Sequence, residues 1–217
     1  MCGRFYVDDE MARELEKICN QIDEKNRLEQ LREKANGQQG RIDIYPGTQA
    51  LFIREGSKAG FGHWGYERRD KRLLVNKRIE TLEEGNFGFD FQKRRCVIPA
   101  RGFYEWNEKK EQFSFRFLKP LYMAGIYHQE AKGDTFTILT TSANQDVENI
   151  HNRMPLLLDE GEVNLWLSDL NIARNFCKQT AESGILLVEK IEKESNTAEK
   201  IIQEKENLTY QQIRLEL

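Results

Sequence analysis

The sequence predicts an α+β fold, with one domain built on a mainly antiparallel, barrel-like β core and peripheral helices. The middle of the chain contains short segments rich in aromatic and β-branched residues, a composition typical of strands. Apolar residues at helical spacing occur near the two ends of the chain. The 217 residues, 39% of them hydrophobic, provide enough material for one large core. Neither an internal repeat nor a Pro- or Ser-rich linker divides them.

The N-terminal region is expected to form a strand followed by a helix. Residues Cys2–Val7 favour a short strand. Asp8 or Asp9 can then cap a helix by accepting hydrogen bonds from its first backbone N–H groups. We expect this helix to end before Asn36-Gly37. Its apolar face carries Met11, Leu15, Ile18 and Ile22.

The middle of the chain is predicted to be β structure. A turn at Lys119-Pro120 is expected to join two antiparallel strands. The predicted strands are Ala50–Ile53, Gly60–Tyr66, Arg95–Pro99, Phe103–Trp106, Phe113–Leu118, Leu121–Tyr127 and Thr135–Thr141.

The C-terminal part combines helices with one further strand. Short helices are expected at Glu160–Leu167 and Asn171–Thr180, followed by a strand at Ile185–Val188. From about Glu189 the chain is highly charged. Within this charged part, a helix is predicted at Thr197–Lys205 and a strand at Leu208–Leu215.

Composition limits the class of protein. No apolar run approaches the roughly 20 residues that span a bilayer, and no apolar signal-peptide core is present, so we expect a cytoplasmic protein. The net charge of -3 argues against a nucleic-acid binder, although a local basic groove can lie on an acidic protein. The cysteines form no C-x-x-C pair, which makes a zinc site or a disulfide framework unlikely to explain them. They are Cys2, Cys19, Cys96 and Cys177, and the last three are expected to be small buried apolar residues.

Cys2 follows the initiator methionine and can become the true N-terminus. An N-terminal cysteine has two nucleophiles on adjacent carbons, an α-amine with an unperturbed pKa of about 7.7–8.0 and a thiol of about 8.5. The amine forms a Schiff base with an aldehyde, and the thiol can close onto the imine carbon to give a five-membered thiazolidine. Position 2 thus allows an aldehyde-directed nucleophile once Met1 is removed. Taken alone, a cysteine at this position by chance is the more common case, and the rest of the chain must decide between the two readings.

Four segments of the chain differ from ordinary core sequence: Met1–Phe5, Val75–Thr81, Arg95–Trp106 and Ile150–Pro155. Together they resemble the SOS-response-associated peptidase (SRAP) family, which includes abasic-site processing proteins. Weaker matches lie at Tyr45–Thr48, His63–Gly65, Thr137–Asn144 and Leu165–Leu167. The resemblance runs from residue 2 to about residue 188 and leaves residues 189–217 as a charged extension, packed on the domain or trailing from it. Between Trp64 and Asn76 the chain is shorter than in typical members.

The resemblance implies a groove for single-stranded DNA and a covalent bond between Cys2 and an abasic site. It implies that Glu105, which lies among aromatic residues, assists crosslink formation and removal of Met1. His151 would transfer a proton to the sugar oxygen during ring opening and crosslink reversal. Asn76 would lie beside the nucleophile and hydrogen-bond the Cys2 backbone or the opened sugar.

Three arginines and three ring-bearing residues are the candidate DNA contacts. Each arginine lies two residues from a candidate catalytic residue, where a guanidinium can grip phosphate. The tryptophans can stack on bases, although a place in the core is an equally weighted reading of Trp64. Glu80 and Thr81 are expected to buttress the site. The candidate DNA-binding residues are Arg4, Arg78, Arg153, Trp106, Trp64 and Pro46.

Three functions remain open from the sequence. The first is an abasic-site sensor that shields such sites during the DNA damage response and is nucleoid-associated when bound. The second is a thiol-dependent peptidase acting on its own Met1–Cys2 bond. The third is a module that binds single-stranded DNA without chemistry. No metal or organic cofactor is implied, because the aldehyde itself supplies the electrophile.

Overall fold

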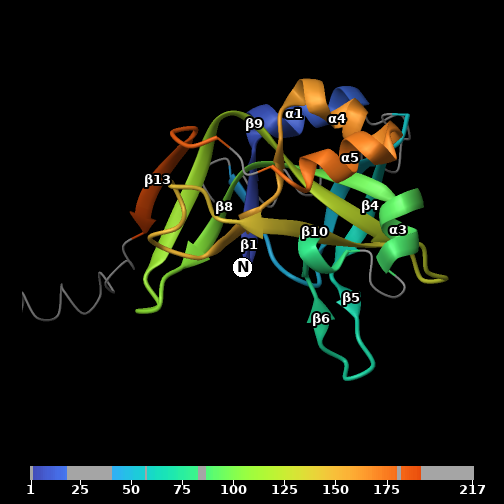
Figure 1. Ribbon diagram of the computed structural model, residues 1–217, viewed down its shortest axis with the longest axis horizontal. Helices are drawn as coiled ribbons and strands as arrows, with labels where there is room; N and C mark the ends of the chain where they lie inside the picture. Colours follow the sequence, from blue (N-terminus) through green and yellow to red (C-terminus); the bar gives the residue numbers. More distant parts are fainter. Residues whose placement is uncertain (1, 19–40, 57, 83–86, 180–181, 192–217) are drawn as a thin grey trace, which may run out of the picture.

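A large, mostly antiparallel sheet of eleven strands forms the centre of the molecule (Figure 1). The computed structural model describes residues 2–18, 41–56, 58–82, 87–179 and 182–191. Within this part of the chain, no helix is both long and apolar enough to cross a membrane. Helices lie at the periphery of the sheet, so the predicted α+β class is confirmed.

Five strands of this sheet close into a barrel. The strand order runs β9-β10-β4-β3-β8, and β8 pairs back onto β9 to close the ring. All contacts in the ring are antiparallel except the pairing of β10 with β4. The predicted barrel-like core is therefore present. The five strands are β3 (Gln49–Arg54), β4 (Lys58–Trp64), β8 (Arg95–Trp106), β9 (Gln112–His128) and β10 (Thr135–Ser142).

Aromatic rings fill the core of the sheet. Phe103 and Phe115 are fully buried and stack with ring centroids 4.9 Å apart. Phe52 and Phe136, also fully buried, pack with centroids 5.9 Å apart. Burial of such large apolar rings is the main stabilising contribution to a core of this kind.

The N-terminal strand and helix form as predicted. Strand β1 (Arg4–Asp8) lies between β8 and β2 (Arg41–Ile44). Helix α1 (Asp9–Ile18) is capped by Asp8, whose Oδ1 accepts a hydrogen bond of 2.9 Å from the backbone N–H of Met11. Of the predicted apolar face, Met11 and Leu15 are buried. The side chain of Ile18, and both Ile22 and the predicted helix end, lie outside the described residues.

The predicted turn at Lys119-Pro120 is wrong. Strand β9 continues through this position, and the strands predicted on either side of it are one element. The register with β8 explains how a proline is tolerated here. Between the pairs Gly102–Arg116 and Ala100–Leu121, β9 contains more residues than β8, so β9 bulges at this point. A bulge of this kind needs no ladder hydrogen bond from the proline nitrogen. β8 likewise unites two predicted strands, Arg95–Pro99 and Phe103–Trp106, into one.

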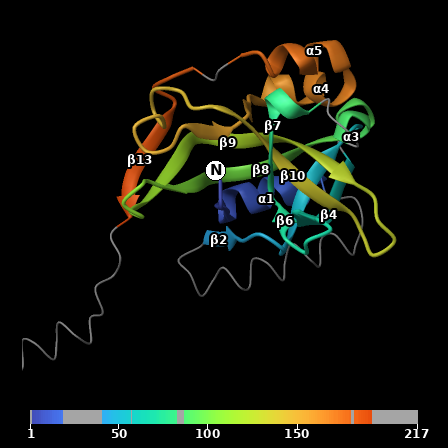
Figure 2. The same cartoon turned by 60° about the horizontal axis from the view of Figure 1, so that its bottom comes forward.

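Three further helices and one helical turn lie around the barrel. The Asp159 and Asp169 side chains cap α4 and α5, as is usual for carboxylates at helix starts. Helix α5 ends before the predicted Thr180. Figure 2 shows α4 and α5 together on one side of the sheet. The elements are α3 (Phe87–Lys93), α4 (Glu160–Ser168), α5 (Leu170–Phe176) and the 3-10 helix η1 (Ile79–Thr81).

Short strands complete the sheet. Strand β7 pairs in parallel with β10, and β13 pairs with the start of β9, extending past the predicted Val188. β5 and β6 form a separate two-stranded hairpin, labelled in Figure 1. The predicted elements at Thr197–Lys205 and Leu208–Leu215 lie outside the described residues. The strands are β5 (Tyr66–Glu67), β6 (Leu73–Leu74), β7 (Asn76–Arg78), β11 (Arg153–Pro155), β12 (Leu157–Leu158) and β13 (Leu186–Ile191).

Candidate functional site

The structure brings Cys2 and Asn76 into direct contact. Nδ2 of Asn76, at the start of β7, donates a hydrogen bond of 2.7 Å to the backbone carbonyl of Cys2. The other amide atom of Asn76, Oδ1, is buried and has no hydrogen-bond partner among the described residues. Asn76 therefore holds the start of the chain with one atom and keeps a second, acceptor atom available beside it.

Glu105 reaches the same place from β8. Strands β1 and β8 are antiparallel with Arg4 opposite Tyr104, so Cys2, two residues before Arg4, falls beside the Glu105–Trp106 end of β8. Glu105 is only 2% exposed, and burial raises its pKa to about 7. A carboxyl with that pKa can both take up and release a proton near neutral pH.

The Cys2 thiol is fully buried in this structure. It donates a hydrogen bond of 3.6 Å from Sγ to the carbonyl of Arg4. Burial, followed by the negative charge of Glu105, raises the pKa of the Cys2 thiol. The thiol is therefore neutral at physiological pH in this state, and activating it requires a change in its surroundings.

His151 lies at an open cleft next to this cluster. The cleft has a volume of about 640 Å³, and Trp106 and His151 are among the residues that line it. Nδ1 of His151 lies 3.0 Å from the backbone nitrogen of Arg153 and 3.1 Å from its carbonyl oxygen, which fixes the orientation of the ring. With its proton on Nδ1, donated to that carbonyl, the neutral ring has its acceptor at Nε2. Burial lowers the pKa of His151, so the imidazole is mostly neutral at pH 7. A neutral ring can accept a proton from a substrate in the cleft.

Arg153 braces the site and is not placed to grip phosphate. Its guanidinium is buried and forms two hydrogen bonds with Glu80, of 2.6 and 2.9 Å, and a third to the carbonyl of Thr140. This pairing lowers the pKa of Glu80. The predicted phosphate contact of Arg153 is therefore incompatible with its position, because its donors are directed at protein groups. The contact between Glu80 and Arg153 is compatible with the buttressing role expected for Glu80.

Trp64 belongs to the core. It is fully buried, packs edge-on against Phe5 with centroids 5.1 Å apart, and donates from Nε1 to the carbonyl of Val75 at 2.9 Å. A base cannot stack on a ring without exposed faces, so the reading of Trp64 as a DNA contact is wrong and the core reading is correct. Through Phe5, Trp64 supports the strand that begins just after Cys2.

Four predicted DNA contacts remain accessible to different degrees. Arg78 and Pro46 are exposed, and Trp106 is half-buried at the cleft. Arg4 is largely covered, since its Nη1 lies 3.2 Å from Oδ2 of Asp43 and its guanidinium stacks 4.4 Å from the centroid of Tyr104. A phosphate would have to compete with Asp43 for Arg4.

Asp43 and Tyr104 were not identified from the sequence as parts of the site. The Tyr104 hydroxyl donates to Oδ1 of Asp43 at 3.0 Å, so Asp43 joins Tyr104 to Arg4. The alternation of polar and apolar residues in Arg41–Ile44 could have indicated a strand with Asp43 on its polar face. Nothing local in the sequence indicates which residue Asp43 contacts.

Known proteins of one family match this chain. The profile described as SOS response associated peptidase (SRAP) matches residues 1–198. The Abasic site processing protein YoaM of Bacillus subtilis is 30% identical over 197 residues, covering 81% of this chain and 83% of that protein. The Abasic site processing protein YedK of Escherichia coli is 28% identical over 160 residues, covering 67% and 72% of the two chains.

A solved structure shares the fold. A crystal structure of a protein from Bacteroides thetaiotaomicron superposes with a TM-score of 0.72 at 20% identity and covers 88% of this chain and 92% of that one. The family profile spans most of the 217 residues and includes all four motifs. The chain therefore belongs to the SOS response associated peptidase (SRAP) family.

Proposed function

We propose that this protein bonds covalently to abasic sites in single-stranded DNA through Cys2, after removal of Met1, and so shields them during the DNA damage response. The observation that carries the proposal is the arrangement around residue 2: Asn76 holds its carbonyl at 2.7 Å, and the buried carboxyl of Glu105, with a pKa of about 7, lies beside it. The relatives support the substrate, because several are named abasic site processing proteins.

Removal of Met1 comes first, because the nitrogen of Cys2 is an amide while Met1 is attached. Resonance delocalises the lone pair of an amide nitrogen, so it cannot attack an aldehyde. Hydrolysis of the Met1–Cys2 bond adds water and releases methionine with a free carboxylate, leaving a free amine on Cys2. In this step Glu105 takes the proton from the attacking water, a role that its pKa of about 7 supports.

Crosslinking then proceeds in two bond-forming steps. The Cys2 amine attacks C1′ of the ring-opened abasic sugar, and loss of water gives the imine. The thiol sulfur next adds to the imine carbon, its proton passes to the nitrogen, and the thiazolidine ring closes. Glu105 supplies the proton that the departing hydroxyl needs, and Oδ1 of Asn76 can accept a hydrogen bond from the amine.

His151 transfers protons during opening of the abasic sugar. An abasic sugar is mostly a closed hemiacetal, and opening it moves the proton of the C1′ hydroxyl away while the ring oxygen gains one. The neutral imidazole at the cleft wall can mediate this transfer. Trp106 at the cleft supplies a stacking ring for a flexible strand. Arg78 and Pro46, both exposed, are the further DNA contacts of this proposal, and Arg78 supplies a cation.

The proposal is tested with the mature protein and single-stranded oligonucleotides, with and without one abasic site, followed by denaturing electrophoresis. We expect a denaturant-resistant adduct only with the abasic strand. Cys177→Ala is the matched control, because Cys177 is a more exposed thiol elsewhere in the fold and should be dispensable. Absence of any adduct, with binding retained, would favour a non-covalent DNA-binding module. Absence of both adduct and binding, with Met1 still removed, would favour a self-processing peptidase.

A further inference from the structure

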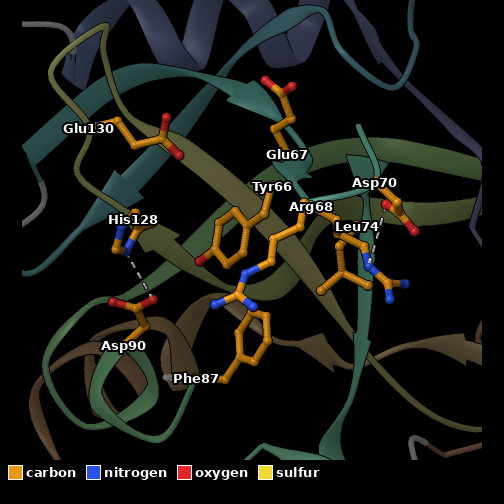
Figure 3. Close-up of a pocket in the computed structure, with 10 residues that line it drawn as sticks. Tyr66, Glu67, Arg68, Asp70, Leu74, Phe87, Asp90, His128 and Glu130 are labelled. Atoms are coloured by element: carbon orange, nitrogen blue, oxygen red, sulfur yellow. Dashed lines mark hydrogen bonds and ion pairs between the residues drawn. The ribbon is translucent and has the colours of Figure 1, made fainter. Parts of the chain in front are cut away.

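A second cavity lies between the β5–β6 hairpin, α3 and the end of β9 (Figure 3). It has a volume of about 540 Å³ and shares no lining residue with the cleft at Trp106 and His151. Its walls include Tyr66, Phe87 and the pair formed by Asp90 and His128. None of these residues belongs to the four motifs that carry the Cys2 chemistry.

The hydroxyl of Tyr66 is the feature that indicates a ligand. Tyr66 is 9% exposed, and its hydroxyl has no hydrogen-bond partner among the described residues. A buried hydroxyl without a partner is unfavourable for the folded protein, which makes it a natural contact for a bound group. Burial, followed by the charge of Asp90, raises the pKa of Tyr66, so the hydroxyl stays neutral and can donate. In Figure 3 its ring lies at the centre of the cavity.

The remaining wall combines flat apolar faces with polar edges. The rings of Tyr66 and Phe87 are nearly parallel, at 5°, with centroids 5.6 Å apart. Nδ1 of His128 lies 3.3 Å from Oδ2 of Asp90, and Arg94 holds the other carboxylate oxygen at 2.9 Å. A planar heterocycle fits such a wall, because its face packs on aromatic rings while its edge exchanges hydrogen bonds with the hydroxyl and the imidazole.

Charged groups of both signs line the cavity. Arg68 and Arg69 are accompanied by four carboxylates, and Arg68 lies 3.9 Å from one of them, Asp70. Acidic walls disfavour a phosphate inside the cavity, so it suits a neutral heterocycle whose phosphate lies outside. The chemistry of the cavity thus matches a nucleic-acid base. The lining carboxylates are Glu67, Asp70, Asp90 and Glu130.

Strand β7 connects this cavity to the nucleophile. Asn76 contacts Cys2, and the next residue, Lys77, contacts Phe87 at the cavity. Neighbouring residues of a strand point to opposite sides, so Cys2 and the cavity lie on the two sides of β7.

The strand pairing of β10 also indicates that the cavity lies near Cys2. β10 pairs in parallel with β4 where Phe136 faces Trp64, and with β7 where Ile138 faces Asn76. Trp64 and Asn76 are therefore only two β10 residues apart, about 7 Å along the strand. Tyr66 follows Trp64 by two residues, which brings the cavity within reach of a nucleotide adjacent to one bound at Cys2.

We propose that this cavity receives the base of a nucleotide next to the abasic one on the same strand. This inference rests on the proposed function and adds a subsite to it. A base of the strand is favoured over a free nucleotide because the carboxylates that line the cavity disfavour a free phosphate, and because the β10 register brings the cavity within reach of a strand bound at Cys2.

The test uses single-stranded oligonucleotides with one abasic site. The bases on either side are replaced one position at a time by tetrahydrofuran, an abasic analogue without an aldehyde. At subsaturating DNA, we expect one position at which loss of the base slows adduct formation about tenfold, the size of a base–aromatic contact. Millimolar deoxynucleoside monophosphate should leave the rate unchanged. Strong inhibition by the mononucleotide would overturn the assignment to the strand.

Tyr66→Phe makes the test specific to the hydroxyl. The variant should be at least as stable as wild type, because it removes an unpartnered buried group, yet it should lose a large part of the dependence on the neighbouring base. Tyr127→Phe is the control, since that ring stacks on Phe52 at 5.4 Å and does not line the cavity. Equal rates for every oligonucleotide would overturn the subsite and leave the Cys2 chemistry standing. Absence of adduct with all of them would overturn both.

Discussion

Asn76 and Cys2 are joined by a hydrogen bond of 2.7 Å across 74 positions of sequence, from the side-chain amide to the backbone carbonyl. This bond joins β7 to the residues that precede β1, so it connects two parts of the chain that share no strand or helix. It determines where the nitrogen of Cys2 lies relative to Glu105. The position of the nucleophile thus depends on a side chain that takes no part in bond making.

Replacing Asn76 by Ala should slow adduct formation about tenfold with little effect on DNA affinity. The carbonyl of Cys2 loses its donor and the residue is less well positioned, a loss of about 1–3 kcal/mol for a buried hydrogen bond. Single-turnover rates at saturating abasic DNA measure the effect. Ser168→Ala, which breaks a hydrogen bond to the carbonyl of Asn164 within α4 and lines neither the cleft at Trp106 and His151 nor the cavity at Tyr66, is a suitable control. A loss confined to affinity would argue against positioning.

Retaining Met1 should abolish the adduct while leaving binding intact. With Cys2→Ser or Cys2→Ala, the free amine still forms an imine, but no thiol closes the ring. We expect an adduct that borohydride traps and strand cleavage by β-elimination, whereas wild type gives a stable adduct without reductant. Mass spectrometry should show that the mature chain begins at Cys2. A stable adduct from protein that demonstrably keeps Met1 would exclude the thiazolidine.

Glu105→Gln and His151→Ala should affect opposite directions of the reaction. Imine formation needs a proton at the departing hydroxyl, where Glu105 acts, so Glu105→Gln should slow formation more than reversal. His151→Ala should impair reversal more strongly, because ring closure of the released sugar needs the imidazole. Formation and release are measured separately, the latter by exchange onto a labelled abasic strand. Equal effects of both substitutions on both rates would contradict separate roles.

Glu105 should also make stability depend on pH. Its pKa is about 7 in the folded protein and about 4.3 when unfolded, so the folded state binds the proton more tightly. The stabilisation is complete below about pH 4 and is lost as pH rises to about 7. Glu105→Gln should therefore match wild type near pH 4.5 and exceed it by roughly 3 kcal/mol at pH 8. Urea unfolding at several pH values measures this, and a constant difference would refute the raised pKa.

Arg78 and Arg153 should differ in their response to salt. Arg78→Ala removes an exposed cation two residues after Asn76 and should weaken binding and flatten its dependence on salt, by a slope of about 0.7 for one phosphate of a single strand. Arg153→Met should keep the slope and lower thermal stability, because Glu80 and the carbonyl of Thr140 lose their donor. An unchanged slope for Arg78→Ala would remove it from the phosphate contacts.

Local patterns were sufficient to predict where most elements of the fold lie. The cap at Asp8, the strand at Gln49–Arg54 and the helix at Glu160–Ser168 depend on residues close in sequence, which a pattern contains. The turn predicted at Pro120 was wrong because the effect of a proline on a strand depends on the neighbouring strand. A bulge against β8 absorbs it, and Gly102 allows the close approach there, since a Cβ would lie 2.4 Å from the carbonyl oxygen of Phe115.

The candidate site likewise has features that the sequence predicted and features that depend on the assembled fold. The hydrogen bond from Asn76 to Cys2 agrees with the expectation drawn from the family motifs. The roles of Arg153 and Trp64 could not be assigned from the sequence. An arginine binds phosphate or stabilises the protein depending on which group lies opposite its guanidinium, and for Arg153 that group is Glu80. Burial decides between stacking and packing for a tryptophan, and burial is a property of the assembled sheet. The catalytic and DNA-binding roles remain predictions.

The pairing of β8 with β9 and the hydrogen bond from Asn76 in β7 to Cys2 impose an order of events during synthesis of the chain. Cys2 leaves the ribosome first, but its neighbours Asn76 and Glu105 follow only after many more residues. At about 5–20 residues per second, the chain extends for several seconds before the pocket around its first residues can exist. Any reaction that requires Glu105 must wait until then, so the chemistry proposed for Cys2 can begin only after the chain has folded around its N-terminal residues.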